Sequence, residues 1–241
     1  MKTIKLFAGS ILLISLAACK AQNIQGVINT VNSTINNNGT PSNDEIIQGL
    51  REALKVGTNN SVAGASKVDG FFKNPKIKIP FPQEAKDMEQ KLREIGMGSQ
   101  CDKFIETLNR GAEEASKSAG SIFVNAITKL TISDGAKILK GADNAATQYL
   151  KDNTTSQLKT AFLPIVKIAL DKVEITKYWN PLTTAYDKIP FVTKVNPDLN
   201  SYVTEKAIDG LFKLIADEEY KIRKDPAARI SDILKKVFGS L

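Results

Sequence analysis

The chain has 241 residues, with 33 Lys and Arg against 26 Asp and Glu, a formal net charge of +7 and no histidine. The absence of histidine excludes serine–histidine and cysteine–histidine nucleophile pairs and every imidazole metal site. Cys19 and Cys101 are the only cysteines, which excludes zinc and iron–sulfur sites that need several thiolates. The modest positive charge is ordinary for a protein surface, and we expect no cofactor, no metal and no nucleic-acid partner.

The first 18 residues have the pattern of a bacterial export signal. Lys2 and Lys5 precede an apolar run over residues 6–18 that ends in small side chains. A membrane-spanning helix needs about 18 or more apolar residues, so this run is too short to be a stable one. We therefore expect residues 1–18 to be a signal peptide.

The end of this run, Leu16-Ala17-Ala18-Cys19, resembles the bacterial lipoprotein box. The resemblance implies that the Cys19 thiol receives a diacylglyceryl group, that cleavage precedes Cys19, and that a fatty acid such as palmitate acylates the new amine. Several acyl chains give a durable anchor without a transmembrane helix. The alternative is an ordinary signal peptide cut near Ala18. Lys20, which is not acidic, favours the outer membrane, with the protein facing the periplasm.

Residues 19–41 are expected to form the lipid anchor and a flexible tether. Asparagine is frequent here, and Gly39-Thr40-Pro41 closes the stretch. Ile24, Ile28, Val31 and Ile35 recur at spacings of three and four, so a short amphipathic helix near the bilayer is the alternative.

Residues 42–241 are expected to form one all-α domain. Ser42 and Glu45 have the spacing of a capping box, which predicts a helix over residues 44–55, followed by a second short helix over 61–68.

A proline-rich stretch over residues 71–82 is the clear exception to the helical pattern. Ile77, Ile79 and Phe81 alternate with Lys76, Lys78 and Pro80, which is a period of two, and its prolines exclude a central strand. We expect an extended segment or edge strand laid over helices. Either its aromatic side chains fill the core, or they form a basic aromatic patch that contacts membrane head groups. The candidate patch comprises Phe71, Phe72, Lys73, Lys76, Lys78 and Phe81.

The rest of the chain shows apolar stripes at helical spacing. Stripes cover residues 85–95, 101–115 and 122–130, and two shorter helices over 134–140 and 144–151 are expected with Ser133 and Asp143 as caps. A longer helix is expected from Thr154, kinked or split at Pro164, and the longest from Leu199 to about Lys224, with Asp198 as its cap. A final helix follows Asp225-Pro226, and its apolar stripe begins at Ile230.

Three details of these helices carry expectations. Cys101 lies on an apolar stripe, so we expect a buried structural thiol. Tyr178-Trp179 is expected at the edge of the core, with a ligand wall as the alternative. Gly49 and Gly210 interrupt helical patterns, which predicts close helix crossings there.

Several stretches resemble a bacterial family of exported helical proteins that is catalogued as a domain of unknown function. The resemblance implies one all-α domain and no known activity. The matching stretches run from residues 49–54 to 234–239 and include Asp69-Gly70-Phe71-Phe72-Lys73-Asn74-Pro75 and Lys206-Ala207-Ile208-Asp209-Gly210-Leu211-Phe212.

Three functions remain open. The first is a non-enzymatic envelope lipoprotein that binds a protein or lipid partner, and the second is a carrier or sensor that encloses an apolar ligand. The third is an enzyme that uses acidic residues, although the spacing of Arg110 and Glu114 is also that of a surface salt bridge. Its candidate polar site comprises Asn109, Arg110, Glu113, Glu114, Asp209, Glu218 and Arg229.

Overall fold

A computed structural model describes residues 40–172 and 174–239 of the chain, and the expected signal peptide, Cys19 and the tether up to residue 39 lie outside this part. Helices dominate the described residues, which contain no strand, so the all-α prediction is confirmed. The α-helices are α2 (Asn43–Ser66), α3 (Lys86–Glu94), α4 (Gly98–Ser116), α5 (Ala119–Thr128), α6 (Ile132–Lys140), α7 (Ala145–Lys172), α8 (Ile175–Tyr186), α9 (Leu199–Lys224) and α10 (Asp232–Phe238).

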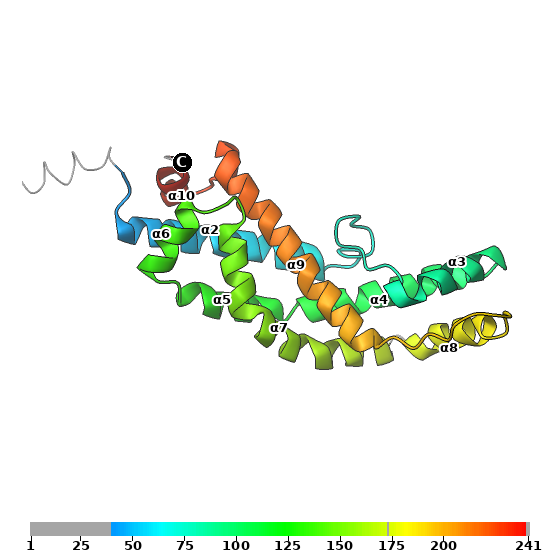
Figure 1. Ribbon diagram of the computed structural model, residues 1–241. Helices are drawn as coiled ribbons and strands as arrows, with labels where there is room; N and C mark the ends of the chain where they lie inside the picture. The colour runs from blue at the N-terminus through cyan, green and yellow to red at the C-terminus, as the bar shows by residue number, and fades with distance from the viewer. Residues whose placement is uncertain (1–39, 173, 240–241) are drawn as a thin grey trace, which may run out of the picture. The chain divides into compact units, whose positions relative to one another are not determined.

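Residues from Pro41 onward form one compact unit whose centre is α9. This helix packs against α2, α4 and α7, and Figure 1 shows it crossing them. Its buried residues include Val203, Ala207, Leu211 and Ile215, which recur every four positions and so lie on one face. Within the described residues, no helix is both long and apolar enough to cross a bilayer.

The first helix is longer than its sequence predicts. Ser42 and Glu45 form the expected capping box, but α2 continues to Ser66 where two helices were expected. Gly57 lies against Glu218 of α9, and the Ser61 hydroxyl donates to the Gly57 carbonyl at 2.7 Å. Packing against α9 therefore outweighs the low helix propensity of the Gly-Thr-Asn-Asn stretch over residues 57–60.

The middle helices differ from their predictions in their caps. The N-cap of α6 is Thr131 and not Ser133, because the Thr131 hydroxyl forms a capping box with Asp134. The two helices expected over residues 144–151 and from Thr154 are one helix, α7, and it continues through Pro164 without a split. With 28 residues, α7 is longer than α9, which has 26.

The C-terminal helices agree with the sequence except at one start. Asp198 caps α9 as expected, since its carboxylate accepts from the Ser201 amide. Asp225 and Pro226 begin a short 3-10 turn, and α10 begins later, with Ser231 as its cap. Ile230, expected on the final apolar stripe, is 69% exposed.

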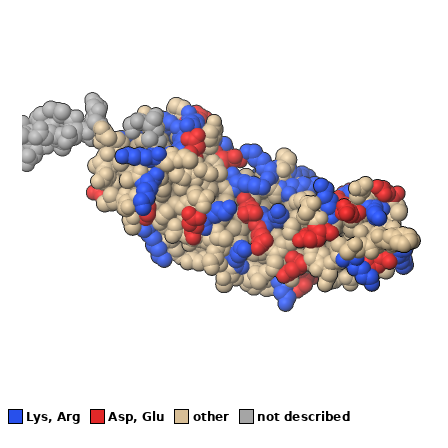
Figure 2. Space-filling view, viewed as in Figure 1, with Lys and Arg blue, Asp and Glu red and all other residues tan. Residues whose placement is uncertain are grey.

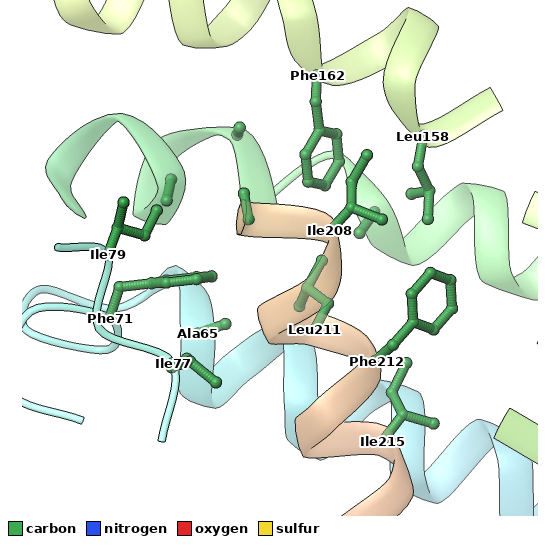
Figure 3. Packing of buried hydrophobic residues seen from close by; sticks show 14 of the residues in the cluster. Ala65, Phe71, Ile77, Ile79, Leu158, Phe162, Ile208, Leu211, Phe212 and Ile215 are labelled. Carbon is green, nitrogen blue, oxygen red and sulfur yellow. The ribbon is translucent and has the colours of Figure 1, made fainter. Parts of the chain in front are cut away.

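Residues 69–82, which we call the extended segment, pass α9 and α4 without forming a strand, but turns replace the expected extended backbone over residues 71–73 and 75–77. Ile77, Ile79 and Phe81 are buried, and Lys76 and Lys78 are exposed, as the alternation predicts. Figure 3 shows Phe71, Ile77 and Ile79 beside α9, with Leu158 and Phe162 of α7 contacting it from another side. The edge-strand alternative is wrong for this stretch. Its backbone amides and carbonyls form hydrogen bonds with side chains or within turns, not with a neighbouring strand.

Gly49 and Gly210 are both sites of close approach, but the predicted helix crossing is confirmed only at Gly49. A Cβ atom on Gly49 would lie 2.6 Å from Val237 of α10, and one on Gly210 would lie 2.7 Å from the Phe71 ring. Gly210 therefore accommodates the extended segment, not a second helix.

We expect Gly210→Ala to lower the free energy of unfolding by about 1–3 kcal/mol, because the added methyl overlaps a fully buried ring that has no space to move. Gly64→Ala in α2 is the matched control: its Cβ meets no atom within 4 Å, so helix propensity should raise stability by up to about 1 kcal/mol. Urea unfolding measures both. Equal stability of the two variants would contradict this packing.

Candidate functional site

Helix α4 presents three polar residues to the extended segment. Asn109 and Glu113 are buried and Arg110 is partly buried, and their spacing of one, three and four residues places them along one side of the helix. We call Asn109, Arg110 and Glu113 the α4 polar cluster.

Asn109 and Glu113 take the place of a neighbouring strand for the extended segment. The Asn109 carboxamide accepts from the Ile79 amide and donates to the Ile79 carbonyl, both at 2.8 Å. The Glu113 carboxylate accepts from the amides of Phe71 at 3.1 Å and Phe72 at 3.3 Å. Because buried backbone groups must be hydrogen-bonded, these two side chains fix the path of the segment.

Arg110 compensates the buried carboxylate and holds the start of the segment. Its guanidinium donates to Glu113 and to Asp69, both at 2.8 Å, and to Glu106 at 3.1 Å. Partial burial opposes the charged form, but the bonds to Glu113 and Asp69 outweigh it and raise the pKa of Arg110. The guanidinium therefore remains charged, and the carboxylate of Glu113 is paired.

Tyr202 of α9 supplies a fourth anchor at the other end of the segment. Its hydroxyl donates toward the carbonyls of Pro80 at 3.1 Å and Phe81 at 3.2 Å. Burial raises the pKa of Tyr202 to about 12, so the hydroxyl keeps its proton and remains a donor.

The turn that begins the segment is conformationally strained. Asp69 has a left-handed backbone with φ of 67°, which is uncommon for a residue other than glycine. A Cβ on the next residue, Gly70, would lie 2.4 Å from the Gly64 carbonyl of α2. Lys73 and then Arg110 lower the pKa of Asp69, so its carboxylate is held ionised between these two cations. These contacts hold the turn in a conformation that its own residues do not favour.

A polar pocket of about 410 Å³ opens beside this turn. One wall is the C-terminal part of α2, the second is the turn itself, and the third is the surface of α9. The lining residues are Asn60, Ser61, Gly64, Lys67, Asp69, Gly70, Lys73, Asn74, Pro75, Leu214, Asp217, Glu218 and Lys221.

Bonds between side chains tie the three walls together. Asn60 of α2 donates to Glu218 of α9 at 2.7 Å, and Lys76 of the segment pairs with Asp217 of α9 at 2.5 Å. Glu218 also pairs with Lys221. Lys67, at the end of α2, is exposed; its carbonyl accepts from the Gly70 amide at 2.9 Å, and its ammonium group makes no ion pair or hydrogen bond among the described residues.

The structure does not gather the candidate polar residues into one site. Asn109 and Arg110 act together on the extended segment, but Glu114 is exposed and pairs with Lys117, not with Arg110. Asp209 is exposed on α9, and Glu218 lies in the polar pocket. Arg229 donates to the carbonyls of Ile222 and Arg223, both at 2.9 Å, and so satisfies the end of α9.

A second buried ion pair, Glu219 with Arg223, was missed by the sequence analysis. The Glu219 carboxylate accepts from the amides of Ala146 at 2.9 Å and Thr147 at 2.7 Å, which caps α7. Arg223 donates to the Ile138 carbonyl at 2.9 Å at the end of α6. Asp143, which was expected to cap the start of α7, pairs with Lys224 instead. Glu219 and Arg223 are four residues apart, which is the spacing of an ion pair on a helix. Exposed pairs have the same spacing, so it does not predict burial.

The candidate membrane patch is not a surface feature as a whole. Phe71 and Phe81 are buried, with 0% and 4% exposure, and Phe72 is partly buried beneath the Lys78 ammonium. Lys73, Lys76 and Lys78 are exposed. Of the two alternatives for these aromatic side chains, filling of the core holds for Phe71 and Phe81, because the segment turns them inward.

The remaining candidates agree with their structural interpretation. Cys101 is buried and unbridged, and burial raises its thiol pKa. Trp179 is 8% exposed and packs against Phe104 at 4.9 Å between ring centroids, so it belongs to the core. In the described part of the chain, no group of three or more Cys, Asp or Glu side chains is placed to hold a metal ion.

Residues 40–239 match the family model described as "Protein of unknown function (DUF4197)". The chain belongs to this family. The match spans the α4 polar cluster, the extended segment and the polar pocket. Searches of curated proteins and of solved structures gave no match.

Glu113 and Glu114 offer a direct test of the polar cluster, because they are neighbours in sequence and differ in burial. We expect Glu113→Ala to lower the free energy of unfolding by about 2–4 kcal/mol, since it removes the acceptor of two backbone amides and a partner of Arg110. Glu114→Ala, which removes an exposed pair, should change it by less than about 0.5 kcal/mol. Urea unfolding distinguishes them, and similar losses would rule out a specific role for Glu113.

Proposed function

We propose that this protein is a lipid-anchored, non-enzymatic interaction module of the bacterial cell envelope. The proposal rests first on Leu16-Ala17-Ala18-Cys19 at the end of an export signal, which resembles a lipoprotein box. Acylation at Cys19 would place the helical domain beside a membrane, at the end of a tether. Lys20 favours the outer membrane, with the domain in the periplasm.

A binding role, as opposed to catalysis, is supported by the bonds that the buried carboxylates make within the fold. Glu113 and Glu219 are buried carboxylates, which are typical of catalytic sites when they face a cleft. Each accepts two backbone amides and pairs with an arginine. The single observation that carries the proposal is therefore that backbone amides and an arginine engage both carboxylates, including Glu113, which borders a surface pocket of about 370 Å³.

The alternative function, a carrier of an apolar ligand, is less well supported because the core has little internal space. The pocket between Leu50, Leu54, Ile215 and Phe238 has a volume of about 10 Å³. Sites for apolar ligands usually have about 300–1,000 Å³. The larger pockets of the described residues open at the surface, and the polar pocket is one of them.

The anchor is tested by Cys19→Ser, with Cys101→Ser as the matched control for loss of a cysteine. We expect Cys19→Ser to move the protein from the membrane fraction to the soluble fraction or to leave it unprocessed, since residue 19 then has no thiol to be acylated. Fractionation and the mass of the N-terminal peptide measure this, and Cys101→Ser should remain lipidated. An unmodified N-terminal cysteine in the wild-type protein would refute the anchor.

A further inference from the structure

The lining of the polar pocket has charges of both signs in equal number. The lysines are Lys67, Lys73 and Lys221, and the acids are Asp69, Asp217 and Glu218. A purely anionic or cationic ligand would meet no net opposite charge here. A ligand that itself carries both signs is complementary, provided that the free donors and acceptors lie on different walls.

The free donors lie on the wall formed by α2 and the turn. The Lys67 ammonium group has no partner among the described residues, and the Lys73 ammonium, whose side chain is 72% exposed, makes one ion pair, to Asp69. The Asn74 carboxamide uses its oxygen for the Lys76 amide, which leaves its amino group free. Lysine ammonium groups bind phosphate as point charges, and the lining has no arginine fork.

The acceptors lie on the α9 wall. The Asp217 carboxylate pairs with Lys76 of the segment, and the Glu218 carboxylate accepts from Asn60 of α2 and pairs with Lys221 of its own helix. A carboxylate accepts from more than one donor, so both retain capacity for an ammonium group. The lining contains no aromatic side chain, which disfavours a quaternary ammonium and favours a primary one that donates hydrogen bonds.

The turn that carries the donors is held rigidly. The α4 polar cluster and the close approach of Gly70 to α2 hold Asp69 in its left-handed conformation and direct the neighbouring side chains outward. A pre-formed site loses less entropy on binding than a mobile loop does. Figure 2 shows that Lys and Arg alternate with Asp and Glu across the visible face, and the pocket adds a concave, fixed arrangement to that surface pattern.

We propose that the polar pocket binds a phosphoethanolamine group, with its phosphate on Lys67, Lys73 and Asn74 and its primary ammonium on Asp217 and Glu218. Two sources carry this group: the head group of phosphatidylethanolamine in a bilayer, and a free phosphoethanolamine compound. The lipid source rests on the proposed function, because acylation at Cys19 would bring the pocket to a bilayer. The site itself does not depend on the anchor.

The test uses the whole mature chain, residues 19–241, with Cys19→Ser so that no acyl chain contributes. Calorimetry measures binding of glycerophosphoethanolamine, glycerophosphocholine, glycerol 3-phosphate and ethanolamine. We expect saturable binding that is strongest for glycerophosphoethanolamine and about fivefold or more weaker for the choline compound, whose methyl groups block donation to the carboxylates.

Two variants separate the ends of the ligand. Lys67→Ala should weaken binding of glycerophosphoethanolamine by about tenfold, the scale of one charge-assisted bond. Asp217→Asn should remove the preference over glycerol 3-phosphate and leave binding of glycerol 3-phosphate in place. Lys129→Ala, which changes an exposed lysine at the end of α5, is the control and should bind as the wild type does.

Vesicles distinguish the two sources. Greater binding to vesicles of phosphatidylcholine with phosphatidylethanolamine than to phosphatidylcholine alone supports the lipid head group. Binding of the soluble compound alone supports a free ligand. No saturable binding, no preference for the ethanolamine compound, or an unaffected Lys67→Ala variant would overturn the site. None of these results bears on Cys19, so the anchor stands or fails separately.

Discussion

The bonds from Glu113 to the amides of Phe71 and Phe72 determine how the extended segment lies on the helices. A buried carboxylate costs several kcal/mol unless it is paired and hydrogen-bonded, and Arg110 and the two amides together satisfy it. Asn109 likewise bonds the Ile79 amide, and the Tyr202 hydroxyl donates to the carbonyls of Pro80 and Phe81. The segment can therefore bury Phe71, Ile77 and Ile79 without a neighbouring strand.

This arrangement connects the core to the surface. The same Arg110 that pairs with Glu113 also bonds Asp69, so the inner cluster and the outer turn share one residue. Behind the turn, Gly210 allows the Phe71 ring to lie against α9. In front of it, Lys73 and Asn74 line the polar pocket. A change in the inner cluster is expected to alter the pocket, although no residue of the cluster lines it.

Local patterns in the sequence predicted much of the fold. Apolar spacing located most of the helices but not α8, Asp198 and Ser42 were correctly identified as caps, and the period of two predicted which side chains of residues 77–81 are buried. The errors arose where distant contacts decide the outcome. The junction of α7 has its cap from Glu219, which lies 73 residues away from Ala146 in sequence. Packing against α9 makes α2 one helix, although its middle is rich in weak helix formers.

The candidate site was predictable only in part. Asn109 and Arg110 were identified as polar residues of interest, but spacing alone paired Arg110 with the exposed Glu114, while the structure pairs it with Glu106, Glu113 and Asp69. The basic aromatic stretch was also recognised, and its alternation predicted the buried Phe81 and the exposed Lys76 and Lys78. Phe71 and Phe72 precede the alternation, so the sequence left their burial open. The pocket is formed by α2, the turn and α9, which meet only in the folded chain.

Native-state hydrogen exchange of the amides of Phe71 and Ile79 tests most directly whether side chains fix the extended segment. If they do, both amides should exchange only through global unfolding, at rates like those of buried amides in α4 and α9, although they belong to no regular element. Exchange as fast as that of exposed loop amides at residues 191–196 would contradict the account, because the bonds to Glu113 and Asn109 would then not hold the segment in place.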